Sequence, residues 1–122
     1  MIQARFIIEA QGRPESFVKN SLKKLIEKLK GVQGVEIYDE HWEPIEEQES
    51  GLLSGLVDLG VRTDDIETFF AIILGFGPSA IILEEPAKLE IRMSELQNIT
   101  NDVIEVLHAF ARANAELRMR RS

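Results

Sequence analysis

The sequence predicts an α+β fold in which two helices cover one face of an antiparallel sheet. Three observations predict it. Alternating apolar residues mark strands at 2–10, 35–43 and 51–62, and a short apolar run marks another at 80–84. Three-to-four-residue spacing marks helices between them. The order is therefore strand, helix, strand, strand, helix, strand. Such an order with a central hairpin predicts the ferredoxin-like βαββαβ sandwich.

The bulk composition is that of one soluble domain. The chain has 122 residues, of which 44% are hydrophobic and 29% charged, so it can bury a core. We expect a single domain over 1–122, made of a ferredoxin-like unit at 1–86 followed by a short strand and a C-terminal helix at 87–122. Because no cysteine occurs, thiol chemistry and cysteine metal sites are excluded. No apolar run resembles a signal peptide or a membrane span, and we expect a cytoplasmic protein.

In the first half of the chain, glycine and proline residues mark the boundaries between the predicted strands and helix. Ile2, Ala4, Phe6 and Ile8 share one parity of the first strand. Pro14 suits the first turn of a helix that runs to about Lys30, with an apolar stripe on one side. In the next strand Val35 and Ile37 share a face that would continue to Asp39, His41 and Glu43, with Tyr38 and Trp42 on the other face; a bulge is the alternative. An acidic segment over 36–49 predicts a long connection before Gly51.

The second half is built around the most apolar stretch of the chain. Thr63 or Asp64 is expected to cap the helix after the third strand. The strand at 80–84 is almost wholly apolar, and alternation of Leu89, Ile91 and Met93 with charged residues predicts a short edge strand. Ser94 is expected to begin a long helix that ends near Arg118.

The long helix predicts assembly. Its apolar residues recur at three- and four-residue spacing through three heptads, with Ile104 and Leu107 beside them, so the stripe is wider than a two-stranded coiled coil needs. We expect the sheet face opposite the first two helices to be apolar, with Ile7, Tyr38, Trp42, Leu56 and either Ile81 or Ile82. Part of the helix would cover this face and part would contact a second subunit, as a homodimer or higher oligomer. The alternative is a helix packed wholly within its own chain. The predicted interface residues are Leu96, Ile99, Val103, Val106, Phe110 and Leu117.

Candidate chemistry is sparse. Alternate positions of an extended strand place Asp39, His41 and Glu43 on one face, where two carboxylates and an imidazole could hold a divalent metal. A solvated acidic strand end is the alternative. No nucleophile elbow, phosphate loop or dinucleotide fingerprint is present, so the sequence indicates no catalytic residue and identifies no cofactor.

The turn Gly12-Arg13-Pro14-Glu15, between the first strand and the first helix, resembles the turn of ACT-type regulatory domains. In that family a similar turn opens the first helix, and effectors bind near it, often at a dimer interface. The resemblance covers residues 1–86 in topology and only Arg13-Pro14 in motif. It implies a ligand site at Arg13, to which the aromatic residues Tyr38 and Trp42 are added as candidates.

The sequence therefore leaves more than one class of function possible. The favoured reading is a non-catalytic oligomeric module that binds a small ligand or a protein partner, and the alternative is a small metal-dependent enzyme using Asp39, His41 and Glu43. Nucleic-acid binding through Arg112, Arg118, Arg120 and Arg121 is disfavoured, because the net charge is −7 and phosphate binding needs a basic field.

Overall fold

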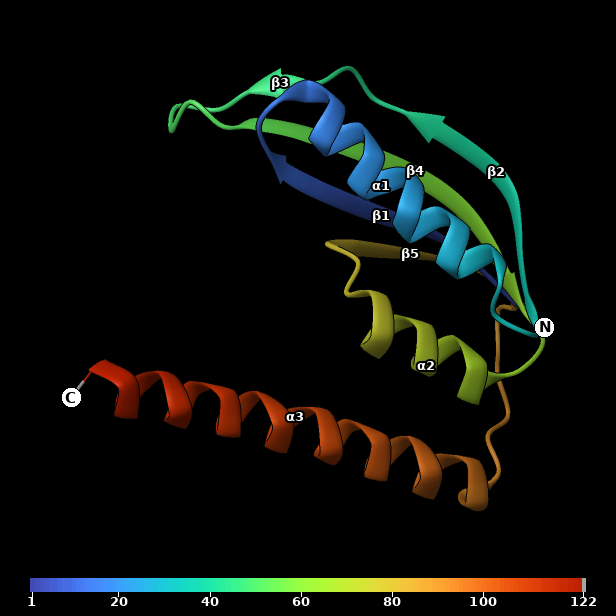
Figure 1. Ribbon diagram of the computed structural model, residues 1–122. Coiled ribbons are helices and arrows are strands. Elements are labelled where there is room, and N and C mark those ends of the chain that lie inside the picture. The colour runs from blue at the N-terminus through green and yellow to red at the C-terminus, as the bar shows by residue number, and fades with distance from the viewer. Residues whose placement is uncertain (122) are drawn as a thin grey trace. The chain divides into compact units, whose positions relative to one another are not determined.

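The computed structural model describes residues 1–121, with Arg121 described by its backbone alone. The elements are β1 (Ile2–Gly12), α1 (Glu15–Lys30), β2 (Val35–Trp42), β3 (Glu46–Glu47), β4 (Leu53–Thr63), α2 (Ile66–Phe76), β5 (Ala80–Glu85) and α3 (Met93–Arg121) (Figure 1). The α+β class, the antiparallel sheet and the long C-terminal helix agree with the sequence prediction.

The long strands lie in the order β2-β4-β1-β5, and β3 adds to the far end of β4. All pairs are antiparallel, and β1 pairs with β4 on one side and with β5 on the other. Residues directly opposite in antiparallel strands share a face. The predicted parity of β1 is confirmed, because Ala4, Phe6 and Ile8 are buried and oppose Val61, Leu59 and Val57, which are also buried.

The core lies between this sheet face and the two helices α1 and α2. The apolar stripe of α1 is buried through Val18, Leu22, Ile26 and Leu29. Gly55 permits close packing here, since a Cβ atom at that position would lie only 2.7 Å from Val18 Cγ1. From α2, Phe69 meets Phe6 edge to face, with ring centroids 5.8 Å apart. One face of the sheet is thus covered by α1 and α2 and forms the core.

The N-cap of helix α2 lies one residue after the later of the two expected positions. Asp65, not Thr63 or Asp64, is the N-cap, and its carboxylate accepts a 2.8 Å hydrogen bond from the backbone N–H of Thr68. Thr63 is instead buried, and its hydroxyl donates to the backbone carbonyl of Asp65. Three polar residues in succession can each cap a helix, and the end of the preceding strand decides among them.

The predicted strand at Leu89–Met93 is wrong. Residues 86–92 form no strand, and α3 already begins at Met93 rather than Ser94. Alternation alone does not make a strand, because the backbone also needs a neighbouring strand to hydrogen-bond with. The fifth strand is instead β3, inside the acidic segment that the sequence marked as a connection.

The chain divides into two compact units, Met1–Leu89 and Glu90–Ser122. The first contains the sheet with α1 and α2, and the second is essentially α3. Among the described residues, no helix is long and apolar enough to cross a membrane.

Candidate functional site

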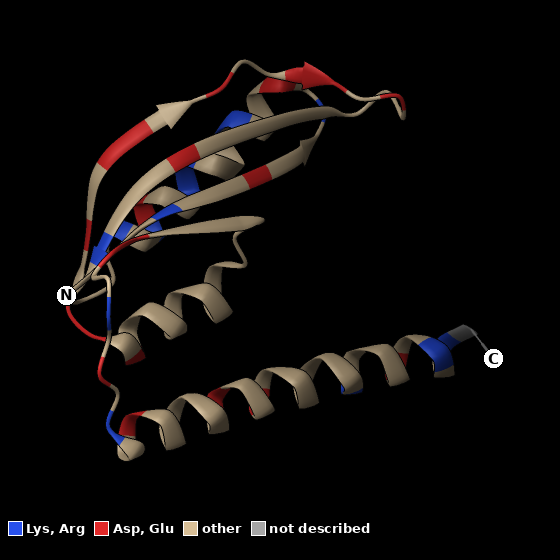
Figure 2. Cartoon of the chain, turned by 180° about the vertical axis from the view of Figure 1, so that it is seen from behind, with Lys and Arg blue, Asp and Glu red and all other residues tan. Residues whose placement is uncertain are grey.

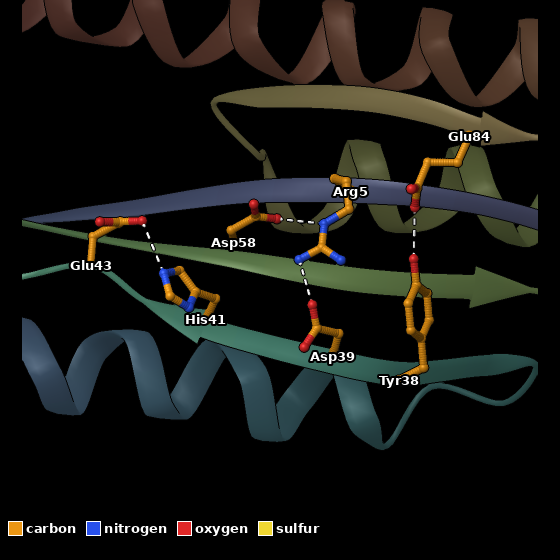
Figure 3. A network of polar contacts seen from close by, with 7 residues as sticks. All are labelled: Arg5, Tyr38, Asp39, His41, Glu43, Asp58 and Glu84. Carbon is orange, nitrogen blue, oxygen red and sulfur yellow. Dashed lines mark hydrogen bonds and ion pairs between the residues drawn. The ribbon is translucent and has the colours of Figure 1, made fainter.

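A network of charged and polar side chains occupies the sheet face opposite α1 and α2 (Figure 3). Its centre is Arg5 on β1, whose side chain is only 19% exposed. One guanidinium nitrogen lies 2.8 Å from Asp39 Oδ2 on β2, and Nε donates to Asp58 Oδ1 on β4 at 2.8 Å. Arg5 therefore links three neighbouring strands through their side chains. We call Arg5, Tyr38, Asp39, Asp58, Arg62 and Glu84 the open-face network.

A bulge in β2 brings Asp39 to Arg5. Ile37 pairs with Val61, but Asp39 pairs with Gly60, so Tyr38 is an extra residue in the ladder. The expectation that Ile37 and Asp39 share a face is therefore wrong, and the bulge alternative is confirmed. Ile37 lies opposite buried Val61. Asp39 lies on the sheet face opposite α1 and α2, which we call the open face. An acidic strand end thus becomes the partner of a central arginine.

Tyr38 lies flat over the strand next to it. A Cβ atom at Gly60 would come within 2.6 Å of Tyr38 Cζ, so glycine leaves the space that the ring occupies. The Arg62 guanidinium stacks on the same ring, 4.1 Å from its centroid. The phenol donates a 2.7 Å hydrogen bond to Glu84 Oε1 on β5. Tyr38 therefore reaches from one edge strand to the other.

Contacts between members of the network shift the pKa values of three of them. The hydrogen bond from Arg5 holds the pKa of Asp39 below its usual range. The hydrogen bond to Glu84, with some loss of solvation, raises the pKa of Tyr38. Desolvation lowers the pKa of Arg5, but its hydrogen bonds to Asp39, Asp58 and Tyr38 outweigh this effect and the pKa rises. At neutral pH the guanidinium and Asp39 are charged and the phenol is neutral, so none of these three groups is prepared for proton transfer.

The raised pKa of Tyr38 predicts a loss of stability in alkali. The folded state favours the neutral phenol, so its contribution is full below the unfolded pKa of about 10 and is lost as pH rises through the higher folded pKa. We expect the free energy of unfolding to fall more steeply above pH 10 in the wild type than in Tyr38→Phe. Urea unfolding at pH 9, 10 and 11 measures this. Equal slopes for the two proteins would contradict it.

The structure does not arrange Asp39, His41 and Glu43 as ligands of one metal ion. Asp39 is held by Arg5, while His41 Nε2 lies 3.3 Å from Glu43 Oε1. Among the described residues, no group of three or more His, Cys, Asp or Glu is arranged to hold a metal ion. A cation bound at Asp39 would also meet the positive charge of Arg5. The geometry gives the metal hypothesis no support.

The three predicted ligand-binding residues lie in separate places. Arg13 contacts β3 and the turn that follows it, with Nη2 2.9 Å from Glu47 Oε1 and Nε donating to the carbonyl of Gly51. Trp42 opposes Val57 and therefore faces α1, with Nε1 2.7 Å from Glu40 Oε1. The expectation that Trp42 shares the open face with Tyr38 is wrong. These residues do not line a common site.

The open face is also less apolar than expected. Ile81 opposes buried Phe6 and belongs to the helix side, so Ile82 is the residue on the open face. Ile7 and Leu56 are half-buried there, but charged groups occupy the middle of the face. Arg5 and Asp58 were missed by the sequence reading. The sequence does contain a signal for them, because both are charged residues at positions that alternate with the buried apolar residues of the two central strands.

An open cavity of about 310 Å³ lies beyond the network at the far end of the same face. We call it the acidic cleft, because three carboxylates and two amides line it. Its residues are Glu9, Gln11, Glu43, Pro44, Glu46, Gln48, Ser54 and Leu56. The sequence reading missed it as a site, although it named the acidic segment that supplies half of the lining. Such a lining suits a positively charged ligand.

Helix α3 carries the predicted interface residues. Leu96, Val106, Phe110 and Leu117 are exposed, Val103 is half-buried and Ile99 is buried. Phe110 is 67% exposed and Leu107, beside the stripe, is 61% exposed. Large apolar side chains in a contiguous row on one helix are expected at an interface rather than in water. In the C-terminal part of this stripe, Phe110 and Leu117 are both more than half exposed.

A family model, the MJ0538 family, matches residues 3–121, and the chain belongs to this family. Comparison with curated proteins and with solved structures gave no match.

Proposed function

We propose that this member of the MJ0538 family is a non-catalytic binding module that self-associates through α3. The observation that carries the proposal is the exposed apolar stripe at Val106, Leu107, Phe110 and Leu117. A single amphipathic helix cannot bury its own stripe, and pairing with a second helix removes it from water. The second class, a metal-dependent enzyme using Asp39, His41 and Glu43, is disfavoured because Arg5 already neutralises Asp39.

The first unit is best understood as a ferredoxin-like sandwich. Without the two-residue β3, its four long strands lie in the order fourth, first, third, second, and each neighbouring pair is antiparallel. The crossovers through α1 and α2 supply the βαββαβ order. This unit would serve as the scaffold that presents the acidic cleft.

The acidic cleft favours a positively charged ligand, such as a polyamine or a basic peptide. Three carboxylates converge on a space of about 310 Å³, at the low end of small-molecule pockets. An effector site at Arg13, which the ACT-type resemblance implies, has less support. The guanidinium there is already paired with Glu47 and Gly51.

Native mass spectrometry tests the proposal, because it reports the number of subunits and any retained ligand together. We expect a dimer or higher oligomer. Replacing Phe110 by glutamate should raise the dissociation constant roughly 30-fold, the effect of losing a central aromatic anchor. Ala115→Glu is the matched control, since Ala115 lies on the opposite side of the same helix and should have little effect. A monomer at micromolar concentration would contradict self-association.

A further inference from the structure

Charge is segregated along α3. Its first half, residues 93–107, contains Glu95, Asp102 and Glu105 and no lysine or arginine. Its second half, residues 108–121, contains four arginines and only one carboxylate, Glu116. Figure 2 shows this change of sign along the helix. A charge pattern of this kind distinguishes between the two directions in which identical helices can pair.

From this pattern we infer that the partner of α3 is the α3 helix of a second copy of the chain, in antiparallel orientation. The inference rests on the proposed self-association and adds its geometry. In a parallel pair the two arginine-rich ends would lie side by side and repel. In an antiparallel pair each basic half lies along the acidic half of the partner, which favours this direction.

The apolar stripe is compatible with this direction. In the heptad pattern that begins at Leu96, Val106 and Phe110 occupy core positions four residues apart. A two-fold axis between them sets Val106 of each copy against Phe110 of the other, so the contact is made twice. Leu107 widens the stripe on the flank away from Asp102 and Glu116, so this apolar flank turns toward the partner. The closest approach of the two helices then falls near Leu107.

Because the chain has no cysteine, single-cysteine variants report the direction directly. Thr100 and Asn114 lie on the same flank as Leu107, seven residues to either side, and all three are exposed. Thr100 and Asn114 are about 21 Å apart along the helix, beyond the reach of a short bis-maleimide crosslinker. The three variants are Thr100→Cys, Leu107→Cys and Asn114→Cys, each otherwise wild type.

The antiparallel arrangement predicts a specific crosslinking pattern. Leu107→Cys should crosslink to itself. Neither Thr100→Cys nor Asn114→Cys should crosslink alone, but an equimolar mixture that has exchanged subunits should give the mixed dimer, identified by its mass. At least tenfold more mixed than homotypic product is expected.

Each other outcome overturns the inference. Efficient homotypic crosslinks of both Thr100→Cys and Asn114→Cys would show a parallel pair, and the proposed function would stand. A dimer that gives no crosslink at any of the three positions would place the interface elsewhere on the chain. A monomeric mass for the wild type would overturn both the inference and the self-association on which it rests.

Discussion

Replacing Phe6 by alanine is expected to lower the free energy of unfolding by about 3–5 kcal/mol. Phe6 is fully buried on β1, one of the two central strands, opposite Leu59 on one side and Ile81 on the other. Its ring also meets Phe69 of α2 edge to face. Alanine would leave a cavity that the sheet and the helix cannot both close, because neighbouring backbones fix their positions. The lost aromatic contact adds to the cost.

Urea unfolding monitored by circular dichroism measures this change at one fixed protein concentration, because self-association makes stability depend on concentration. Phe17→Ala is the matched control, since Phe17 is 52% exposed and the same atoms are removed. We expect the control to cost about 1 kcal/mol or less. If Phe6→Ala does not fold, Phe6→Leu serves instead, with a smaller cost of about 1–2 kcal/mol. Similar losses at positions 6 and 17 would contradict the described core.

Features that depend on local periodicity were predictable. Ile2, Ala4 and Phe6 alternate with polar residues, and their parity alone places them on the buried face. The stripe of α1 follows in the same way from three-to-four-residue spacing. Each pattern needs only a few neighbouring residues and a single buried face, so the sequence contains all the information required.

Features that depend on strand pairing could not be decided from the sequence, which left the bulge in β2 as one of two alternatives. The bulge at Tyr38 reverses the parity of β2, and only the register against Val61 and Gly60 reveals which residue is extra. The supposed strand at Leu89–Met93 has suitable alternation but no partner strand. Pairing is a long-range property, and a single residue of shift moves every following side chain to the other face.

The candidate site illustrates the same limit. Tyr38 and Asp39 were singled out from the sequence, but their partners Arg5, Asp58 and Glu84 come from three other strands. The sequence predicts a metal ligand at Asp39, because local spacing does not show that Arg5, 34 residues earlier in the chain, is its partner. The residue types indicated polar chemistry, and the register decided that this chemistry is an internal ion-pair network.

Replacing Arg5 by methionine is expected to destabilise the protein by about 1–3 kcal/mol at pH 7. Methionine keeps most of the length and apolar contact of the side chain but removes the charge. Asp39 and Asp58 would then lose their shared partner and repel each other across the strands. Arg13→Met is the matched control. Arg13 pairs with Glu47 but is 58% exposed, so its loss should cost about 0.5 kcal/mol or less.

The pH dependence identifies the origin of this loss. Because Arg5 lowers the pKa of Asp39 in the folded state, the stabilisation is complete above the unfolded pKa of about 3.9 and disappears as pH falls through the lower folded pKa. The difference in stability between the wild type and Arg5→Met should therefore shrink between pH 5 and pH 2. A difference that stays constant over this range would indicate lost packing rather than lost charge pairing.

A double variant separates the two causes further. In Arg5→Met, the carboxylate of Asp39 remains without its cation, and replacing it by asparagine removes that charge. The double variant Arg5→Met/Asp39→Asn should therefore be less destabilised than the sum of its single variants, since the two residues contact each other. Strictly additive losses would show that Arg5 stabilises the sheet through Asp58 or through packing alone. A coupling between positions 5 and 39 would show that the open-face network stabilises the bulged strand β2 against the rest of the sheet.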